Sequence, residues 1–272
     1  MSSPPSPFLY LLPIGVAATG LILGLTWKKR GNNSKLAGFD FFDEMVGGGI
    51  PVGSSVAIIG APASGKSLLC QQLAHKYLTE NKACIFISYD DLPGKIRANM
   101  KSFGWYLTSH EQDGTFTFID CYSSRARTTS QEKYALRQPF ALTELGIETS
   151  TALEEIRDIP KALVLDSATS LFTNVDASRV IGFLQDQGAK VKGQEGISIF
   201  TLGKGVVASN FANRLEEAVD GIIELDIAEE RGKRIRRMRV KKLRGQHHLN
   251  EWVMFDINRK SGIVFLNTKK AR

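Results

Sequence analysis

The stretch VAIIGAPASGKSLLCQQL, residues 56–73, decides the fold. Residues 55–59 predict a short buried strand, and after Lys66 the apolar residues recur at helical spacing. Between the strand and the helix, GAPASGKS at 60–67 matches the pattern G-x-x-x-x-G-K-[ST]. In this pattern backbone N–H groups at a helix N-terminus surround phosphates, the lysine neutralises the outer phosphates and the Ser hydroxyl ligates magnesium.

The stretch therefore predicts a nucleotide site, with Lys66 on the outer phosphates and Ser67 on Mg²⁺. A glycine-rich turn without a ligand is the alternative, but that interpretation leaves the lysine without a purpose. The residues predicted to bind the nucleotide are Gly60, Ala61, Pro62, Ala63, Ser64, Gly65, Lys66, Ser67 and Leu68.

A second magnesium ligand is expected at the end of a neighbouring buried strand, because sites of this class hold the metal with a carboxylate there. In KALVLDSATS, residues 162–165 are a continuous apolar run typical of a strand covered on both faces, and Asp166 follows it. Asp166 is therefore predicted to ligate Mg²⁺. An Asp that only caps a loop is the alternative.

A pair of adjacent carboxylates, Asp90 and Asp91, follows the strand-like run CIFISY at 84–89. Ligands of open α/β sheets bind at the carboxyl ends of the strands, so these carboxylates predict a group that polarises an attacking water. For Asp91, N-capping of the helix expected in LPGKIRANM is an equally open interpretation.

The order of the remaining elements predicts an α/β fold. Further strand-like runs occur at 115–120, 197–202 and 221–225 with helical stretches between them, which favours a mainly parallel sheet flanked by helices. From 234 to 265 three short strand-like runs follow one another, so a C-terminal antiparallel extension is expected. Residues 122–149, rich in Ser, Thr, Arg and Gln, are predicted to form a long surface connection.

The composition is that of a folded protein with a sizeable core: 272 residues, 43% hydrophobic and 23% charged. The formal net charge of +7 is compatible with nucleic acid, an anionic membrane surface or a phosphorylated ligand. Cys70, Cys84 and Cys121 are scattered without metal-ligand spacing, which excludes a disulfide framework or a zinc site.

The N-terminal segment predicts a membrane anchor. Residues 8–27, FLYLLPIGVAATGLILGLTW, carry no charge over about 20 residues, the length that crosses a bilayer's hydrocarbon core. A cleaved signal peptide would need the basic start that MSSPPSP lacks, and a buried globular helix is rarely this long at a terminus. We therefore expect a tail at 1–7 and one transmembrane helix at 8–27.

The charges after this segment predict its orientation. Lys28, Lys29 and Arg30 follow the apolar run directly, and the positive-inside rule then places the rest of a single-pass membrane protein in the cytoplasm. A basic linker at 28–35 leads to the nucleotide-binding domain at 36–272.

The stretch GFDFFDEMVGGGIPVGSSVAIIGAPASGKS resembles the opening of the KaiC-like and GvpD-like branch of the RecA-superfamily P-loop ATPases. The likeness continues through FISYDDLP, SFGWYL, VLDSAT, EEAVDGIIEL and VKKLRGQHH, and so covers nearly everything after Lys35. The resemblance implies a RecA-like P-loop NTPase core that binds ATP and Mg²⁺, and a homo-oligomer that is hexameric if it follows the nearest relatives.

The resemblance also implies roles for particular residues. Asp90 would align the hydrolytic water, Asp166 would be the Walker B aspartate, and Lys242 and Arg244 would reach the γ-phosphate of a neighbouring subunit. Two residues apart on a strand, Lys242 and Arg244 share a face and can aim at one target. Their own subunit's phosphates already have Lys66, which favours action in trans.

Two departures from the family's pattern bear on turnover. FISYDD has aspartates where the family has paired glutamates, so the shorter Asp90 predicts a poorly aligned water and slow hydrolysis. Ala63 stands where the family commonly has glycine, which removes backbone freedom but no N–H donor.

The basic stretch RGKRIRRMRVKKLRG at 231–245 has three open interpretations: a strand with a solvated face, attraction to an anionic membrane leaflet, or nucleic-acid binding. In the first, Met238, Val240, Lys242 and Arg244 alternate with Arg237, Arg239 and Lys241.

The function predicted from these features is a membrane-anchored cytoplasmic ATPase that acts as an ATP-dependent oligomeric regulatory or assembly module with an unidentified protein partner. The alternatives are a nucleotide sensor with little hydrolysis and a DNA-binding recombination or repair accessory. The basic stretch has no aromatic stacking run beside it, which weighs against the last.

Overall fold

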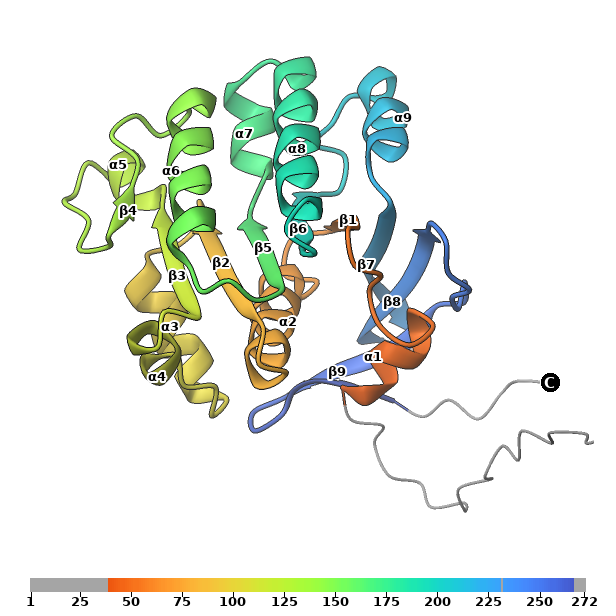
Figure 1. The fold of residues 1–272 in the computed structure, drawn as a ribbon. Coiled ribbons are helices and arrows are strands. Elements are labelled where there is room, and N and C mark those ends of the chain that lie inside the picture. Colours follow the sequence, from red (N-terminus) through yellow and green to blue (C-terminus); the bar gives the residue numbers. More distant parts are fainter. Residues whose placement is uncertain (1–38, 231, 267–272) are drawn as a thin grey trace, which may run out of the picture. The chain divides into compact units, whose positions relative to one another are not determined.

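The computed structural model describes residues 39–230 and 232–266. Their strands form one sheet in the order β10-β9-β8-β7-β1-β6-β5-β2-β3-β4 (Figure 1). The first strands along the chain are β1 (Ser55–Gly60), β2 (Ala83–Ser88), β3 (Phe116–Asp120), β4 (Tyr134–Ala135) and β5 (Lys161–Asp166). The later strands are β6 (Ile197–Gly203), β7 (Gly221–Glu230), β8 (Lys233–Leu243), β9 (Val253–Asn258) and β10 (Gly262–Phe265).

The predicted combination of a parallel sheet and an antiparallel extension is confirmed. Neighbouring strands from β4 to β7 pair in parallel, whereas β7 with β8, β8 with β9, and β9 with β10 pair antiparallel. The apolar runs of β2 and β5 are buried at every position, as expected for central strands covered on both faces.

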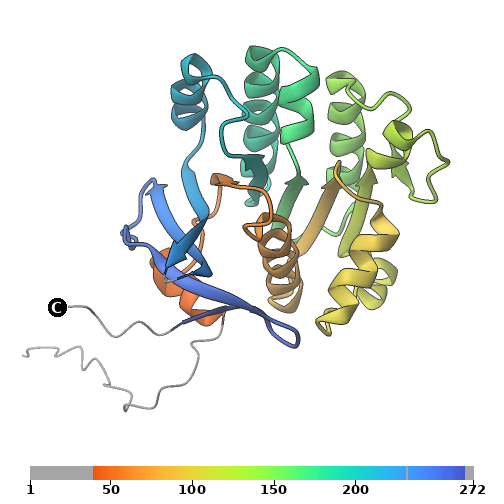
Figure 2. The same cartoon turned by 180° about the vertical axis from the view of Figure 1, so that it is seen from behind.

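Helices cover both faces of the sheet (Figures 1 and 2). One core contains Val56, Ile58 and Phe86 of the strands together with Leu69 and Met100, and its helices are α1 (Asp40–Met45), α2 (Lys66–Thr79) and α3 (Pro93–Ser102). The core on the other face holds Ala57, Ile85 and Ile87, and its helices are α6 (Leu142–Glu155), α7 (Thr169–Asn174), α8 (Ala177–Lys192) and α9 (Ser209–Ala218). Alternate residues of one strand therefore enter different cores.

The segment predicted as a long surface connection is more ordered than expected. Residues 122–149 contain α5 (Tyr122–Ala126), the short strand β4 and the first half of α6, while α4 (Thr108–Gln112) precedes β3. The prediction failed because burial of Leu145, Thr149 and Ala152 against the sheet stabilises a helix that the polar composition obscures. Its polar residues are the outer face of an amphipathic helix.

The predicted transmembrane helix at 8–27, with its tail and linker, lies outside the described residues. Within 39–230 and 232–266, no helix has both the length and the apolar character needed to cross a bilayer.

Candidate nucleotide site

The loop between β1 and α2 has the backbone shape of a narrow cradle. A Cβ on Gly60 would lie 2.6 Å from the Leu225 carbonyl oxygen and 2.6 Å from the Ser64 hydroxyl, so a larger residue does not fit there. Gly65 has φ of 105° and Ala63 has φ of 61°, both in the region that favours glycine. Ala63 thus adopts the conformation that its glycine counterpart would take more easily.

The N-terminus of α2 faces this loop without a side-chain cap. Gly65 is the N-cap residue and makes no side-chain hydrogen bond, so the first N–H groups of α2 are available to an anion. The Lys66 ammonium donates to the carbonyl oxygens of Gly60 and Ala61, each at 3.0 Å. Burial lowers the pKa of Lys66, and the nearby charges of Asp166 and Asp90 oppose that shift.

Asp166 is buried at the end of β5, next to this helix terminus. Its Oδ1 accepts a hydrogen bond from the Thr201 hydroxyl at 2.6 Å. Burial raises the pKa of Asp166, while hydrogen bonds from Thr201 and Ser67 act in the opposite direction. A buried carboxylate beside the Ser67 hydroxyl is a donor set that suits Mg²⁺, and the cation would offset the cost of burying the charge.

One cavity of about 570 Å³ joins four of the predicted residues, since Ser67, Asp90, Asp91 and Asp166 line it. Gln71 and Asn99 line the same cavity and hydrogen-bond to each other at 2.6 Å. The geometry therefore brings Ser67 of the phosphate-loop pattern and the acids that follow β2 and β5 to one place.

The two adjacent acids differ in their surroundings. Asp90 Oδ2 accepts from the Ser167 hydroxyl at 2.6 Å and Oδ1 from the Ser170 hydroxyl at 2.9 Å. Asp91 instead forms an ion pair with Lys95 at 2.9 Å. The capping alternative for Asp91 is wrong in detail, because Leu92 is the N-cap residue of α3 and makes no side-chain cap.

The hydroxyl groups of Ser167, Ser170 and Thr201 were missed in the sequence. Ser167 and Ser170 lie in VLDSATS directly after Asp166, and Thr201 lies in β6, which pairs with β1 and β5. The rule that ligands meet the carboxyl ends of parallel strands could have found Thr201. The serines had no signal of their own, because their contact with Asp90 spans 77 and 80 residues of sequence.

Lys242 and Arg244 lie away from this cavity within one chain. Lys242 Nζ donates to the carbonyl oxygens of Glu216 and Val219, and Arg244 Nη2 donates to Glu217 O at 2.9 Å. Both cations therefore hydrogen-bond to carbonyls at the C-terminus of α9, a favourable place for positive charge. Burial lowers the pKa of Lys242, and the neighbouring Arg244 charge adds to that shift.

A β-bulge gives this pair its orientation. Ile222 is opposite Lys242 and Ile223 is opposite Val240, so Lys241 is an extra residue in β8. The expected alternation is therefore wrong: Val240 packs in the α2-side core, whereas Lys242 turns to the α9 side. The two predicted cations still share a face with each other.

Two arginines of the basic stretch pair with acids of the neighbouring strand β7. Arg237 pairs with Asp226 at 2.7 Å and lowers the pKa of that carboxyl, and Arg239 pairs with Glu224 at 2.6 Å. Both guanidinium groups lie 4.6 Å from the centre of the Trp252 ring. This pairing accounts for the two arginines without a nucleic-acid or lipid partner.

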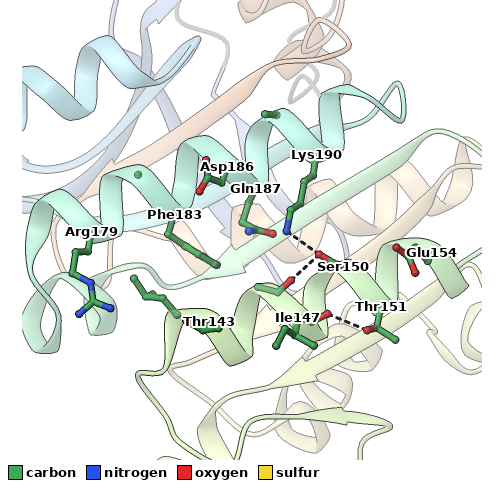
Figure 3. A pocket seen from close by; sticks show the side chains of 14 residues that line it. Thr143, Ile147, Ser150, Thr151, Glu154, Arg179, Phe183, Asp186, Gln187 and Lys190 are labelled. Carbon is green, nitrogen blue, oxygen red and sulfur yellow. Dashed lines mark hydrogen bonds between the residues drawn. The ribbon is translucent and has the colours of Figure 1, made fainter.

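A second hollow lies between α6 and α8 (Figure 3). This groove measures about 900 Å³, and its lining includes Ile147, Ser150, Phe183, Gln187 and Lys190. Lys190 Nζ donates to the Ser150 hydroxyl across it at 2.8 Å. None of the residues predicted to bind nucleotide or metal lines this groove.

The strand order, the loop between β1 and α2, and the acids after β2 and β5 define a RecA-like P-loop nucleotide-binding fold. Residues 37–270 match the family described as "ATPase: KaiC". A UPF0273 protein of Methanocaldococcus jannaschii is 34% identical over 233 residues, which cover 84% of this chain and 94% of that protein. A UPF0273 protein of Pyrococcus furiosus is 32% identical over 231 residues, covering 84% and 92%.

A solved structure has the same fold. The crystal structure of a KaiC-like protein from the hyperthermophilic archaeon Pyrococcus horikoshii superposes with a TM-score of 0.68 at 22% identity, over 87% of this chain and 98% of that one. Taken with the family match, the chain belongs to the KaiC-like family of ATPases.

The predicted single-pass membrane localisation is contradicted. The family match begins at residue 37, after the predicted anchor. The Methanocaldococcus relative aligns over 94% of its length, which leaves too little for a counterpart of a span of about 20 residues. The prediction was wrong because length and lack of charge alone do not distinguish a membrane span from other apolar segments.

Proposed function

We propose that this chain is a magnesium-dependent ATPase that binds ATP at Gly60–Ser67. The observation that carries the proposal is the cavity of about 570 Å³ where Ser67, Asp90 and Asp166 meet beside the uncapped N-terminus of α2. Membership of the KaiC-like family supports ATP and Mg²⁺ as the ligands.

In the proposed site the N–H groups of the loop and of α2 bind the phosphates, and Lys66 exchanges its two loop carbonyls for phosphate oxygens. Ser67 and Asp166 would hold Mg²⁺, which would supply positive charge to neutralise the phosphates. Asp90 orients the attacking water and accepts its proton, while the water oxygen bonds to the γ-phosphorus and the bond to the ADP oxygen breaks.

We further propose that the active form is a homo-oligomer in which Lys242 and Arg244 complete the site of an adjacent copy. Within one chain both side chains bind only carbonyls and carboxylates around the end of α9. Four strands, β7, β1, β6 and β5, separate β8 from β2, which places β8 roughly 24 Å from the strand that carries Asp90. Oligomers of other KaiC-like proteins support this arrangement.

A nucleotide sensor with slow hydrolysis is the second candidate function. The Asp90 side chain is short, and the Ser167 and Ser170 hydroxyls hold its carboxylate in one place, which limits how far it can reach towards a water. ATP would then act mainly through the assembly it stabilises.

The test measures ATP binding by calorimetry and phosphate release for the purified chain with Mg²⁺. Lys66→Ala should weaken ATP binding by about 100-fold, equivalent to about 2.7 kcal/mol, because the loop loses its cation. Lys101→Ala removes an exposed lysine of α3 and serves as the matched control. Unchanged affinity in Lys66→Ala would reject the phosphate-loop assignment, and binding without phosphate release would favour the sensor.

A further inference from the structure

Asp90 is connected to Arg125, a basic residue that belongs to none of the motifs described in the sequence analysis. Arg125 lies on α5, the short helix that follows β3. Its Nη1 lies 3.1 Å from the Ser170 hydroxyl and 3.9 Å from Asp90 Oδ1. Ser170 in turn donates to Asp90 Oδ1 at 2.9 Å. The three side chains form a continuous chain of polar contacts that ends at the proposed water-polarising acid.

The chemistry of the guanidinium group determines the direction of these hydrogen bonds. Arg125 can only donate, so the Ser170 oxygen must accept from it and direct its own proton to Asp90. A charged donor also polarises the hydroxyl and strengthens the next bond in the chain. Since Ser167 donates to the other oxygen, each oxygen of Asp90 has one fixed donor.

The carboxylate keeps room for a water despite these bonds. An ionised carboxylate has about four acceptor sites, and Ser167 and Ser170 occupy one site on each oxygen. Asp90 lines the cavity of about 570 Å³ together with Ser67 and Asp166. The hydroxyl groups therefore hold the plane of the carboxylate while acceptor sites stay open.

Hydrogen bonds to a buried carboxylate anchor the start of the helix that carries Arg125. The buried Asp120 carboxylate at the end of β3 accepts from the backbone N–H groups of Tyr122 and Ser123 at 3.0 and 2.9 Å. It also accepts from the hydroxyls of Ser123 and Ser130, each at 2.6 Å. Asp120 thereby anchors the start of α5, and Arg125 in the last turn of this helix reaches the Tyr89 carbonyl oxygen after β2, at 3.5 Å, and the Ser170 hydroxyl after β5.

We propose that Arg125 is a positioning residue for ATP hydrolysis, which acts through Ser170 to hold the Asp90 carboxylate in the orientation that serves the attacking water. This inference rests on the proposed function and adds a cation supplied by the same chain. Arg125 does not line the cavity, so we expect its substitution to leave the affinity for ATP unchanged.

A purely structural role would have a different consequence. If Arg125 only tied α5 to α7, its loss would lower thermal stability and leave the turnover of the folded enzyme unchanged. A positioning role lowers kcat and leaves KM and the calorimetric affinity for ATP unchanged, because only the water's alignment suffers.

The experiment compares full-length Arg125→Gln, Arg125→Lys and Ser170→Ala with Arg137→Gln as the charge-matched control. Arg137 belongs to the same connection, is exposed, and its guanidinium makes no hydrogen bond or ion pair within the described part of the chain. Steady-state phosphate release gives kcat and KM, and calorimetry with a non-hydrolysable ATP analogue gives the affinity.

We expect Arg125→Gln to lower kcat about tenfold, a fraction of the 100-fold or more that a general base contributes, with KM and affinity within about twofold. Ser170→Ala should lower kcat similarly, and the double variant should lose no more than either single one, because the two residues act in one chain. Arg125→Lys should recover part of the loss. Ser170→Ala keeps the test valid if Arg125→Gln does not fold.

Equal kcat values for Arg125→Gln and Arg137→Gln would overturn the inference, as would losses in Arg125→Gln and Ser170→Ala that multiply in the double variant. These outcomes leave the proposed function standing as long as Asp90→Asn abolishes phosphate release. Absence of phosphate release in the unsubstituted chain would overturn the proposed ATPase activity and this inference together.

Discussion

Ala63 has φ of 61°, a conformation that is unfavourable for a residue with a Cβ. Ala63→Gly should relieve this strain, but glycine also raises the conformational entropy of the unfolded chain. The net effect should be a stabilisation of the fold by up to about 1 kcal/mol. Ala61→Gly is the control in the same loop, because the φ of Ala61 is not positive and the change should only destabilise. Denaturant unfolding of both variants measures the difference, and equal destabilisation would contradict strain at residue 63.

Asp166 gives the stability of the chain a dependence on pH. Burial raises its pKa above the ordinary value, so the folded chain binds this proton more tightly than the unfolded chain. The tighter binding of this proton stabilises the folded chain fully below the ordinary carboxyl pKa of about 3.9. This stabilisation is lost as the pH rises through the raised pKa of Asp166. Without metal, the melting temperature should therefore fall with pH more steeply than in Asp166→Asn.

Thermal melts in EDTA across this pH range check the slope, and added Mg²⁺ should recover stability at neutral pH only when Asp166 is present. Parallel pH slopes for the two proteins would show that ionisation of Asp166 is not coupled to folding.

At the scale of elements, Gln72 joins helix α2 to the last strand of the sheet. Its Oε1 accepts from Ile263 N at 2.7 Å, and its Nε2 donates to Ser261 O at 3.1 Å and to Ile263 O at 3.3 Å. The side chain amide thus pairs with the backbone of β10. Since α2 begins at the phosphate loop, this contact also connects the loop's helix to the antiparallel extension.

Gln72→Leu should destabilise the fold by about 3 kcal/mol, because it leaves the buried N–H and carbonyl oxygen of Ile263 without partners. Gln185→Leu makes the same chemical change on the exposed face of α8 and should be nearly neutral. Urea unfolding compares the two. Similar free energies of unfolding would mean that β10 does not depend on α2.

At the scale of the whole molecule, ATP should change the state of association. The Arg244 side chain is 54% exposed and makes two hydrogen bonds, to Glu217 O and Asp220 Oδ1, so a neighbouring subunit's phosphate can recruit it. A non-hydrolysable ATP analogue with Mg²⁺ should shift the chain to larger species, ADP should be much less effective, and Arg244→Ala should bind ATP without the shift.

Light scattering at high protein concentration measures this assembly, with Arg234→Ala, an exposed arginine of the same strand, as the control. A particle size that saturating nucleotide leaves unchanged would reject the trans role of Lys242 and Arg244.

The amino-acid sequence by itself determined the class of fold and the centre of the site. The phosphate-loop pattern is local, so its residues must lie on one strand-to-helix turn in any fold that contains it. Asp90 and Asp166 could be found because each follows an apolar run, and parallel strands end at one edge of the sheet. The membrane localisation expected from the apolar run at 8–27 was wrong, since apolar length alone does not identify a membrane span.

Only the tertiary structure decided the contacts between distant segments. The extra residue Lys241 turns Lys242 towards α9, and nothing in the local alternation of β8 reveals a bulge that arises from pairing with β7. Arg125 reaches Ser170 across 45 residues and Gln72 reaches Ile263 across 191, pairings that periodicity cannot encode. The order of the strands determines which segments are buried side by side. Polar groups buried there must form hydrogen bonds with the groups that the fold places next to them.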